Sequence, residues 1–593
     1  MATPTVDKFL TEIARILREK NGVQLQDFLV IEPPFPQLYA VMVSEFHQAF
    51  PKGREDALQQ KCRHALPDLE DRDDGSSWTA FVKFMGQYFS FIRDVNTEDL
   101  VETFELLRSL VKQSVNALSN STMGVIILPT VIAFSRTLTK LTIALHKKPE
   151  LIAHLKQRQS SDEGGSRSTL VDTAADVLRD AFSACLNDRT ASASGVGPDG
   201  KPQGKKISIY VIANLCLKLY FECDKIRSAE QILANIQNGS PPLSLYPASQ
   251  RVTYLYYLGR YMFLNNHFFR AQLALQAAYD QCHLRCLQQR TRLLPYLITA
   301  NIILGRFPSR ALLARPEASG LDAKFLPLCR AIARGDLTAF RDLLDTPDGP
   351  HTDWFVRQRI LLPLRNRCEV LVWRSLARKT FLLAGSQGAP GERKAPTFDL
   401  QDFVSLARFL EKKALLPPDQ RDHANNTAAA ARPGSSHTNS IFIFPPSRAP
   451  TPPLPSYTDP DLPPPSEETD VSEDQEQPLL PSLSEIEAVL SSLISQGLLN
   501  GFISHRQLRF AIRGAKERGA LSGGWPNVWE VVSRRETESV PGWKRDEDIV
   551  GGGGRGGGVF GGGGGGGAAV GRLGPGMVIN LSGARPVGAV GGM

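Results

Sequence analysis

The clearest change of hydrophobic pattern along the chain lies between residues 483 and 518. Apolar side chains first recur at the spacing of a helix face: Ile486, Val489, Leu490, Leu493 and Ile494. Ser484 stands three residues before Glu487, which is the spacing of a capping box at a helix start. Gly497 can end the helix because glycine adopts positive φ without strain. The pattern therefore predicts a helix over about residues 484–497.

After this helix the pattern changes to a period of two. Phe502 and Ser504, then Leu508, Phe510 and Ile512, are expected on one face of a hairpin. Arg509 and Arg513 fall on the opposite face, on either side of Ala511. A helix, a short turn and a two-stranded hairpin in this order predict the second half of a winged helix.

Helical periodicity also dominates the first third of the chain. Apolar positions recur at helical spacing from Val6 to Leu17, and an aromatic stripe runs from Trp78 to Phe89. We expect residues 1–160 to form an N-terminal helical region. Residues 161–205 contain Gly, Ser and Lys clusters and are expected to be a partly flexible helix and loop.

Residues 206–383 show a loose repeat of a turn residue followed by a bulky apolar one. The four turns are Asp224-Lys225-Ile226, Asn266-His267-Phe268, Gly305-Arg306-Phe307 and Gly335-Asp336-Leu337. Small residues such as Gly259 and Ala271 would let paired helices approach closely, as in tetratricopeptide repeats. Single helical hairpins cannot bury their apolar faces alone, so the pattern predicts a stacked solenoid.

Residues 398–535 are expected to form the complete winged helix. Its first helix is predicted at Phe398–Lys413, where Phe403, Val404, Ala407 and Leu410 recur on one face. Residues 417–481 interrupt the module with a Pro-, Ser- and acid-rich stretch that cannot build a core and is predicted to be disordered. Closing such a long loop adds little entropic cost, so the module can tolerate it. Residues 536–593 end in a Gly-rich tail that is also predicted to be disordered.

A helical-hairpin solenoid that runs into a C-terminal winged helix resembles the PCI family. The matching segments are Tyr254–Tyr279, Leu293–Ser309 and Glu485–His505. The last is the most specific, because it is similar to the family's Ile-x-Gly-Tyr-Ile-Ser-His hairpin entry, with Leu499, Asn500 and Phe502 substituted. Within the family, the resemblance is closest to the branch of the TREX-two mRNA-export complex and its signalosome-associated paralogue. The expected fold class is mainly all-α: a TPR-like solenoid followed by a winged helix with a small β-hairpin.

The resemblance implies a non-enzymatic scaffold that is found in the nucleus or at the nuclear pore, with some of it in the cytoplasm. Such a subunit would pair with a larger helical export scaffold and a small acidic Sem-type subunit, bind RNA or DNA, and reach the nuclear pore indirectly. The alternatives are a signalosome-associated subunit that acts only through protein contacts, and a subunit of the proteasome lid or of an initiation factor.

Charge adds local detail to this expectation. The net charge of +7 is small for 593 residues, so its distribution is more informative than its size. Cations cluster around the hairpin and on two helices expected before it: Arg506, Arg509, Arg513, Lys516, Arg518, Arg374, Arg378, Lys379, Lys412 and Lys413. Clustered cations favour phosphate binding, because each neutralised phosphate releases counterions. A cradle for an acidic protein, or an ordinary solvated face, remains an alternative.

Direct base reading is not expected, because Glu485–Leu499 is acidic and apolar and lacks base-reading side chains. Gly195–Lys201 resembles a phosphate loop, but Pro202 replaces the required Ser or Thr. Cys282 and Cys286 would share a helix face, yet no second ligand pair lies at zinc spacing. We therefore expect no cofactor, metal or catalytic residue. The apolar run Met123–Phe134 is too short to cross a membrane, and no membrane association is expected.

Overall fold

The computed structural model describes residues 3–67, 78–96, 98–150, 169–188, 195–345, 351–387, 395–415, 481–535 and 540–545. The predictions of disorder at 417–480 and 546–593 lie outside these residues. The fold is mainly helical, as the sequence predicted, and its small sheet has a third strand in addition to the predicted hairpin.

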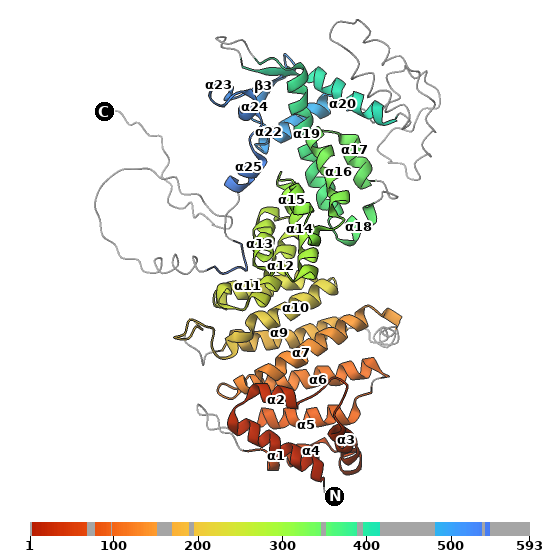
Figure 1. Cartoon of the computed structure of the whole chain (residues 1–593), viewed down its shortest axis with the longest axis vertical. Helices are drawn as coiled ribbons and strands as arrows, with labels where there is room; N and C mark the ends of the chain where they lie inside the picture. Colours follow the sequence, from red (N-terminus) through yellow and green to blue (C-terminus); the bar gives the residue numbers. More distant parts are fainter. Residues whose placement is uncertain are drawn as a thin grey trace, which may run out of the picture. The chain divides into compact units, whose positions relative to one another are not determined.

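The N-terminal helices lie at the end of the protein where the chain begins (Figure 1). They are α1 (Pro4–Glu19), α2 (Gly22–Phe28), α3 (Gln37–Ala49), α4 (Glu55–Ala65), α5 (Thr79–Asp94), α6 (Leu100–Leu118), α7 (Gly124–His146) and α9 (Leu170–Leu186). The predicted stripe on α1 is buried, from Val6 to Leu17. Helix α9 contacts α6, α7 and α10, so the stack continues across residues 160 and 206. The domain boundaries proposed there stay predictions.

Helix α7 is the one described helix that is long and apolar enough to cross a membrane. It contacts α2, α6, α9 and α10, and 56% of its most apolar window is buried inside the protein. Helix α7 is thus packed between other helices, as a core helix is. Core helices can be as long and as apolar as a helix that crosses a membrane.

The repeats continue with helices paired as hairpins. They are η1 (Gly204–Ser208), α10 (Ile209–Glu222), η2 (Ile226–Ser228), α11 (Ala229–Gly239), η3 (Leu243–Leu245), α12 (Ala248–Leu264), α13 (Phe268–Gln281), α14 (Leu287–Ile303), α15 (Arg310–Leu313), η4 (Pro316–Ala318), α16 (Leu321–Arg334) and α17 (Leu337–Asp345). The four turn residues predicted from sequence, Asp224, Asn266, Gly305 and Gly335, all have φ between 61° and 80°. Left-handed backbone at one position lets each hairpin reverse direction.

Close helix approach explains one small residue in the repeats. A Cβ atom at Gly259 of α12 would lie 2.6 Å from Leu275 Cγ of α13. The two helices therefore need glycine at this contact, as the tetratricopeptide-like pattern predicted.

The C-terminal module begins after two further helices. These two helices are α18 (Thr352–Arg357) and α19 (Leu361–Ala384). The elements after them are β1 (Thr397–Asp399), α20 (Leu400–Leu415), α22 (Leu483–Ser495), β2 (Gly501–Ser504), β3 (Arg509–Ile512), α23 (Ala515–Arg518), α24 (Ala520–Gly524) and α25 (Val528–Arg535). The antiparallel sheet has the order β1-β3-β2. Helix α20 contacts α22, α19 and β1, so residues on both sides of the interruption meet in one module.

The predicted starts of two helices in this module were wrong. Phe398 lies in strand β1 and not in a helix, because it pairs with Phe510 across the sheet. The capping box of α22 uses Ser482 and Glu485, two residues earlier than predicted. Both Ser482 and Ser484 have a Glu three residues later, so spacing alone could not distinguish them.

Candidate nucleic-acid interface

Pairing register decides which side chains of the small sheet face solvent. Phe398, Ile503 and Phe510 lie opposite one another, and Phe510 and Phe398 are buried. Side chains alternate along a strand, so Arg509 and Ala511 occupy the other face, opposite Ser504 and Phe502 respectively. Arg513 follows β3 and is also exposed.

Phe502 differs from the sequence-based prediction. It was assigned to the buried face with Phe510, but its side chain is 49% exposed and it lies on the face of Arg509. A two-residue alternation read along β2 and β3 separately does not give the register between the strands. An exposed aromatic ring beside cations is the combination that single-stranded nucleic acids use for stacking and phosphate contact.

The other cations of the hairpin region are also exposed. Arg506 lies in the turn between β2 and β3, while Lys516 and Arg518 lie on the short helix α23. We call Phe502, Arg506, Arg509, Arg513, Lys516 and Arg518 the wing face. Its nearest carboxylate contact is Asp399 Oδ2, 3.9 Å from Arg509 Nε. Both side chains of this pair are solvent-accessible, so their interaction is weak.

Arg374 of α19 has a structural role. Its Nε donates to Leu498 O at 3.1 Å and its Nη2 donates to Pro526 O at 2.8 Å. Burial, followed by repulsion from Arg378, lowers the pKa of Arg374 to about 10. The guanidinium thus holds α19 to two loops of the module, and we leave it out of the wing face.

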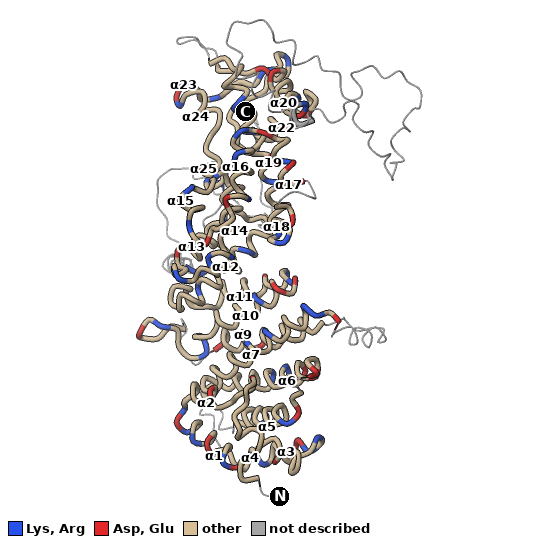
Figure 2. Tube along the Cα trace, turned by 45° about the vertical axis from the view of Figure 1, so that its right-hand side comes forward, with Lys and Arg blue, Asp and Glu red and all other residues tan. Residues whose placement is uncertain are grey.

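The remaining candidates lie on α19 and α20. Arg378 and Lys379 are exposed, and Arg378 lies near Arg374 and hence near residue 526. Lys412 is exposed on α20, whereas the side chain of Lys413 lies outside the described residues. Lys and Arg also occur along the repeats, where they are mixed with Asp and Glu (Figure 2). The distinguishing property of the wing face is its local excess of cations.

Within the described chain, no three His, Cys, Asp or Glu side chains are grouped so as to hold a metal ion. Cys282 ends α13 and Cys286 precedes α14, so they do not share one helix face as the sequence suggested. The segment Gly195–Pro202 closes on itself through a bridge between Val196 and Pro202.

The architecture is that of a helical-repeat scaffold which ends in a winged helix. No family model matches the chain. A PCI domain-containing protein of Schizosaccharomyces pombe is 28% identical over 409 residues, covering 68% of this chain and 84% of that protein. A CSN12 homologue of Gibberella zeae is 33% identical over 243 residues, covering 39% and 50%. PCI domain-containing protein 2 of Danio rerio is 23% identical over 390 residues, covering 66% and 85%.

These similarities agree with the fold and with the resemblance seen in the sequence. The chain is thus similar in sequence to PCI domain-containing proteins, among them PCI domain-containing protein 2, and to the CSN12 homologues.

Proposed function

We propose that this protein is a non-enzymatic nuclear scaffold subunit that couples transcription to mRNA export and binds RNA or DNA through the wing face. PCI-domain proteins act in multi-subunit complexes, which supports a scaffold role over catalysis. The finer assignment to an export complex of the TREX-two type is part of the proposal.

The observation that carries the nucleic-acid assignment is the wing face itself. Five exposed cations lie on the hairpin, in its turn and on α23, within the same stretch of chain as the exposed ring of Phe502, and the Asp399 carboxylate lies 3.9 Å from Arg509 Nε. Phosphate contacts from such cations give affinity without sequence reading, while the ring can stack on any base. Single-stranded RNA is therefore the favoured ligand.

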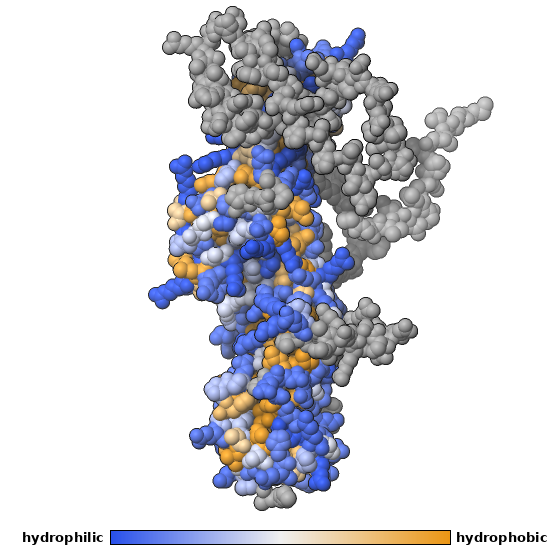
Figure 3. Space-filling model, turned by 90° about the vertical axis from the view of Figure 1, so that its right-hand side faces the viewer, coloured by the Kyte–Doolittle hydropathy of each residue, from blue (hydrophilic) through white to orange (hydrophobic). Residues whose placement is uncertain are grey.

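Partner subunits are proposed on the basis of exposed apolar side chains. Leu362, Leu382 and Leu383 of α19 are 53–71% exposed, and Val356 of α18 is 52% exposed. Figure 3 shows hydrophobic residues gathered in patches among hydrophilic ones on one face of the protein. A larger helical export subunit would cover such apolar positions, while a small acidic Sem-type subunit would contact cations. Attachment to the nuclear pore would then be indirect.

The proposal is tested with the variant Arg509→Glu/Arg513→Glu in the assembled complex. We expect the affinity for single-stranded RNA to fall at least tenfold, and the slope of log affinity against log salt to decrease by about 1.4, because each lost phosphate contact removes about 0.7. The measurement is fluorescence anisotropy at several salt concentrations.

The matched control is Lys8→Glu/Arg18→Glu, which makes the same charge change on exposed positions of α1. It should change the affinity less than twofold. Equal losses for both variants would mean that net charge, and not the wing face, determines binding. Unchanged RNA binding by the wing variant would exclude the wing face.

The second candidate is a signalosome-associated subunit that acts through protein contacts only. The relatives named CSN12 homologue favour it. It predicts no measurable RNA affinity at physiological salt and copurification with other PCI subunits, which affinity purification with mass spectrometry would detect. A subunit of the proteasome lid or an initiation factor would instead bury the winged helix between PCI subunits.

A further inference from the structure

Residues 540–545 return to the helical repeats after the winged helix has ended. Val540 is 3% exposed, and Trp543 packs against the hydrophobic core. The Gly542 amide donates to Gln237 Oε1 of α11 at 3.0 Å, across 305 sequence positions. The tail predicted from residue 536 onward thus contains a segment with a defined place, which we call the clasp.

The clasp both donates hydrogen bonds to the repeats and accepts hydrogen bonds from them. Lys544 Nζ donates to Ser240 O at 2.8 Å, and the Leu243 amide donates to Lys544 O at 3.3 Å. The hydroxyl of Tyr254 on α12 donates to Gly542 O. Tyr254 is fully buried, which raises its pKa well above the ordinary value.

The Tyr254 hydroxyl has one hydrogen-bond partner among the described residues, Gly542 O. The clasp covers this hydroxyl and also supplies its hydrogen-bond acceptor, so docking does not leave a buried polar group unpaired. The hydroxyl therefore recognises a peptide carbonyl at this position, and the site is shaped for a backbone and not only for an apolar side chain.

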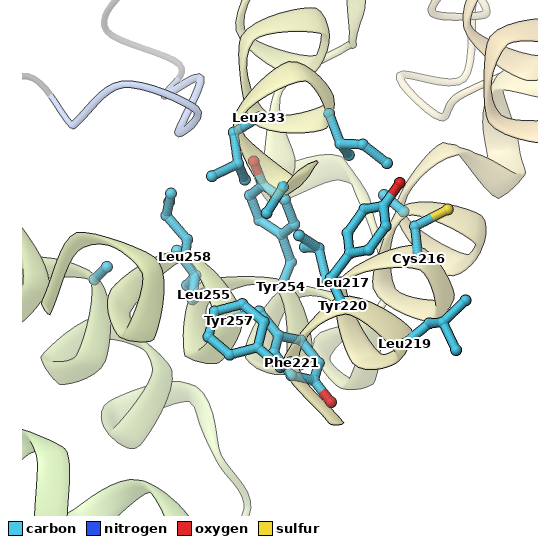
Figure 4. Packing of buried hydrophobic residues seen from close by; sticks show 14 of the residues in the cluster. Cys216, Leu217, Leu219, Tyr220, Phe221, Leu233, Tyr254, Leu255, Tyr257 and Leu258 are labelled. Atoms are coloured by element: carbon cyan, nitrogen blue, oxygen red, sulfur yellow. The ribbon is translucent and has the colours of Figure 1, made fainter. Parts of the chain in front are cut away.

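The surface under the clasp also selects glycine. Gly542 has φ of 90°, which side-chain-bearing residues rarely adopt. A Cβ at this position would lie 3.2 Å from Leu258 Cδ1 and 3.3 Å from Leu233 Cβ. Figure 4 shows Leu233 of α11 and Leu255 and Leu258 of α12 around Tyr254. The positive φ therefore favours glycine at this position, and an added Cβ would also require the neighbouring side chains to shift by a few tenths of an ångström.

We propose that the surface formed by Leu233, Gln237, Ser240, Leu243, Tyr254 and Leu258 on α11, η3 and α12, which we call the groove, is a docking site for a short peptide that forms a turn. In the clasp this turn is closed by the Trp543 amide, which donates to Val540 O at 3.0 Å. The peptide that the groove takes has an apolar residue, Pro, Gly, Trp and Lys in succession, and the groove's occupant is the chain's own Val540–Lys544. The groove binds this sequence by its own affinity and does not need the covalent connection to α25.

The tether strengthens this binding but does not create it. Only residues 536–539 separate α25 from Val540, so the effective concentration of the clasp at the groove is high. A partner carrying the same motif would enter the groove only after the clasp has left.

The test places a protease site between residues 536 and 539 of the full chain, so that the protein folds before the connection is cut. After cutting, fragment 540–593 should comigrate with the body in size-exclusion chromatography at micromolar concentration. In the variant Gly542→Val the fragment should separate, with at least tenfold weaker retention. The control Gly557→Val changes a glycine outside the described residues and should behave like the unsubstituted protein.

A second measurement uses the uncut chain. The Leu243 amide, which donates to Lys544 O, should exchange its hydrogen at least tenfold faster in Gly542→Val than in Gly557→Val. Separation of the unsubstituted fragment after cutting would overturn the proposal. So would equal retention or equal exchange in the two glycine variants, because the groove would then not recognise the segment by its glycine.

Discussion

The carboxylate of Glu317 shows how single polar residues hold the repeats together. Its side chain is 4% exposed and accepts hydrogen bonds from the Tyr279 hydroxyl at 2.7 Å and from Arg290 Nε at 2.9 Å. Arg290 also donates to the carbonyls of Tyr279 and Cys282. One buried ion pair therefore joins the end of α13, helix α14 and the 3-10 helix η4.

The charge state of Glu317 follows from these partners. Burial alone would raise the pKa of Glu317, but the hydrogen bonds from Tyr279, the backbone and Arg290 outweigh burial and lower it. A carboxylate with a lowered pKa in the folded state stabilises the protein above the unfolded-state pKa, and this contribution is lost as the pH falls.

We expect Glu317→Gln to lower the free energy of unfolding by about 3 kcal/mol at pH 7, because Arg290 is left buried without its counterion. The difference from the unsubstituted protein should shrink as the pH falls below about 4.5, where an unfolded-state carboxyl takes up its proton. Urea unfolding at pH 7 and pH 4 measures both. The control Glu102→Gln removes an exposed partner of Lys52 and should change the free energy of unfolding by less than 1 kcal/mol at either pH.

Among the elements, the hairpin turns are where sequence and conformation correspond most directly. Asp224, Asn266, Gly305 and Gly335 were recognisable because a left-handed turn residue followed by a bulky apolar one recurs. At Gly335 an added Cβ would also lie 2.5 Å from the Leu376 amide nitrogen of α19. This turn therefore needs glycine for both its conformation and its packing.

Gly335→Ala should destabilise the protein by more than 2 kcal/mol, because backbone of another helix cannot move aside at little cost. Gly200→Ala is the matched control: its φ is 69°, almost the 68° of Gly335, but no atom lies within 4 Å of its added Cβ. It should cost about 1 kcal/mol from conformation alone. Thermal unfolding of both variants would separate the cost of the backbone conformation from the cost of the contact with Leu376. Equal losses would show that the contact with Leu376 contributes nothing.

The sequence could not predict short elements whose conformation depends on contacts with residues far away in the chain. Strand β1 has three residues and pairs with β3 more than a hundred positions later, so no local periodicity marks it. Phe502 is a large apolar residue and was therefore assigned to the core. Only its pairing with Ala511 shows that it lies on the wing face. Arg374 reads as one more cation, because the carbonyls that bind it come from the loops after α22 and α24. The clasp could not be predicted because the residues that bind it lie far earlier in the chain; Gln237, for example, is 305 positions before Gly542.

At the scale of the whole molecule, helix α25 joins the winged helix to the repeats. Trp529 lies with its ring centroid 3.4 Å from Arg306 Cζ and 5.2 Å from the ring centroid of Phe269. Arg306 follows the turn glycine Gly305, and a Cβ at Gly305 would lie 2.7 Å from Val528 Cβ. The turn between α14 and α15 thus forms part of the contact with the C-terminal module.

Trp529→Ala should weaken this connection by about 2 kcal/mol through the loss of apolar contact and of the cation–π interaction. Amide hydrogens of α25 and of residues 304–306 should then exchange roughly tenfold faster, as hydrogen-exchange mass spectrometry would detect. Arg534→Ala on the same helix, whose side chain is 74% exposed, serves as the control and should leave the exchange unchanged. Faster exchange spread evenly over all helices would contradict a local role for Trp529.

The winged helix consists of two stretches of the chain that are joined where β1 pairs with β3, and we call this junction the seam. The strand and helix before the seam, β1 and α20, are joined to α22, β2 and β3 by a shared sheet and helix contacts, whatever the number of residues between positions 415 and 481. The module could be encoded as two separate polypeptides that reassemble at this sheet. The intervening interval is then open to lengthening, shortening or replacement during evolution without a change in how β1 pairs with β3.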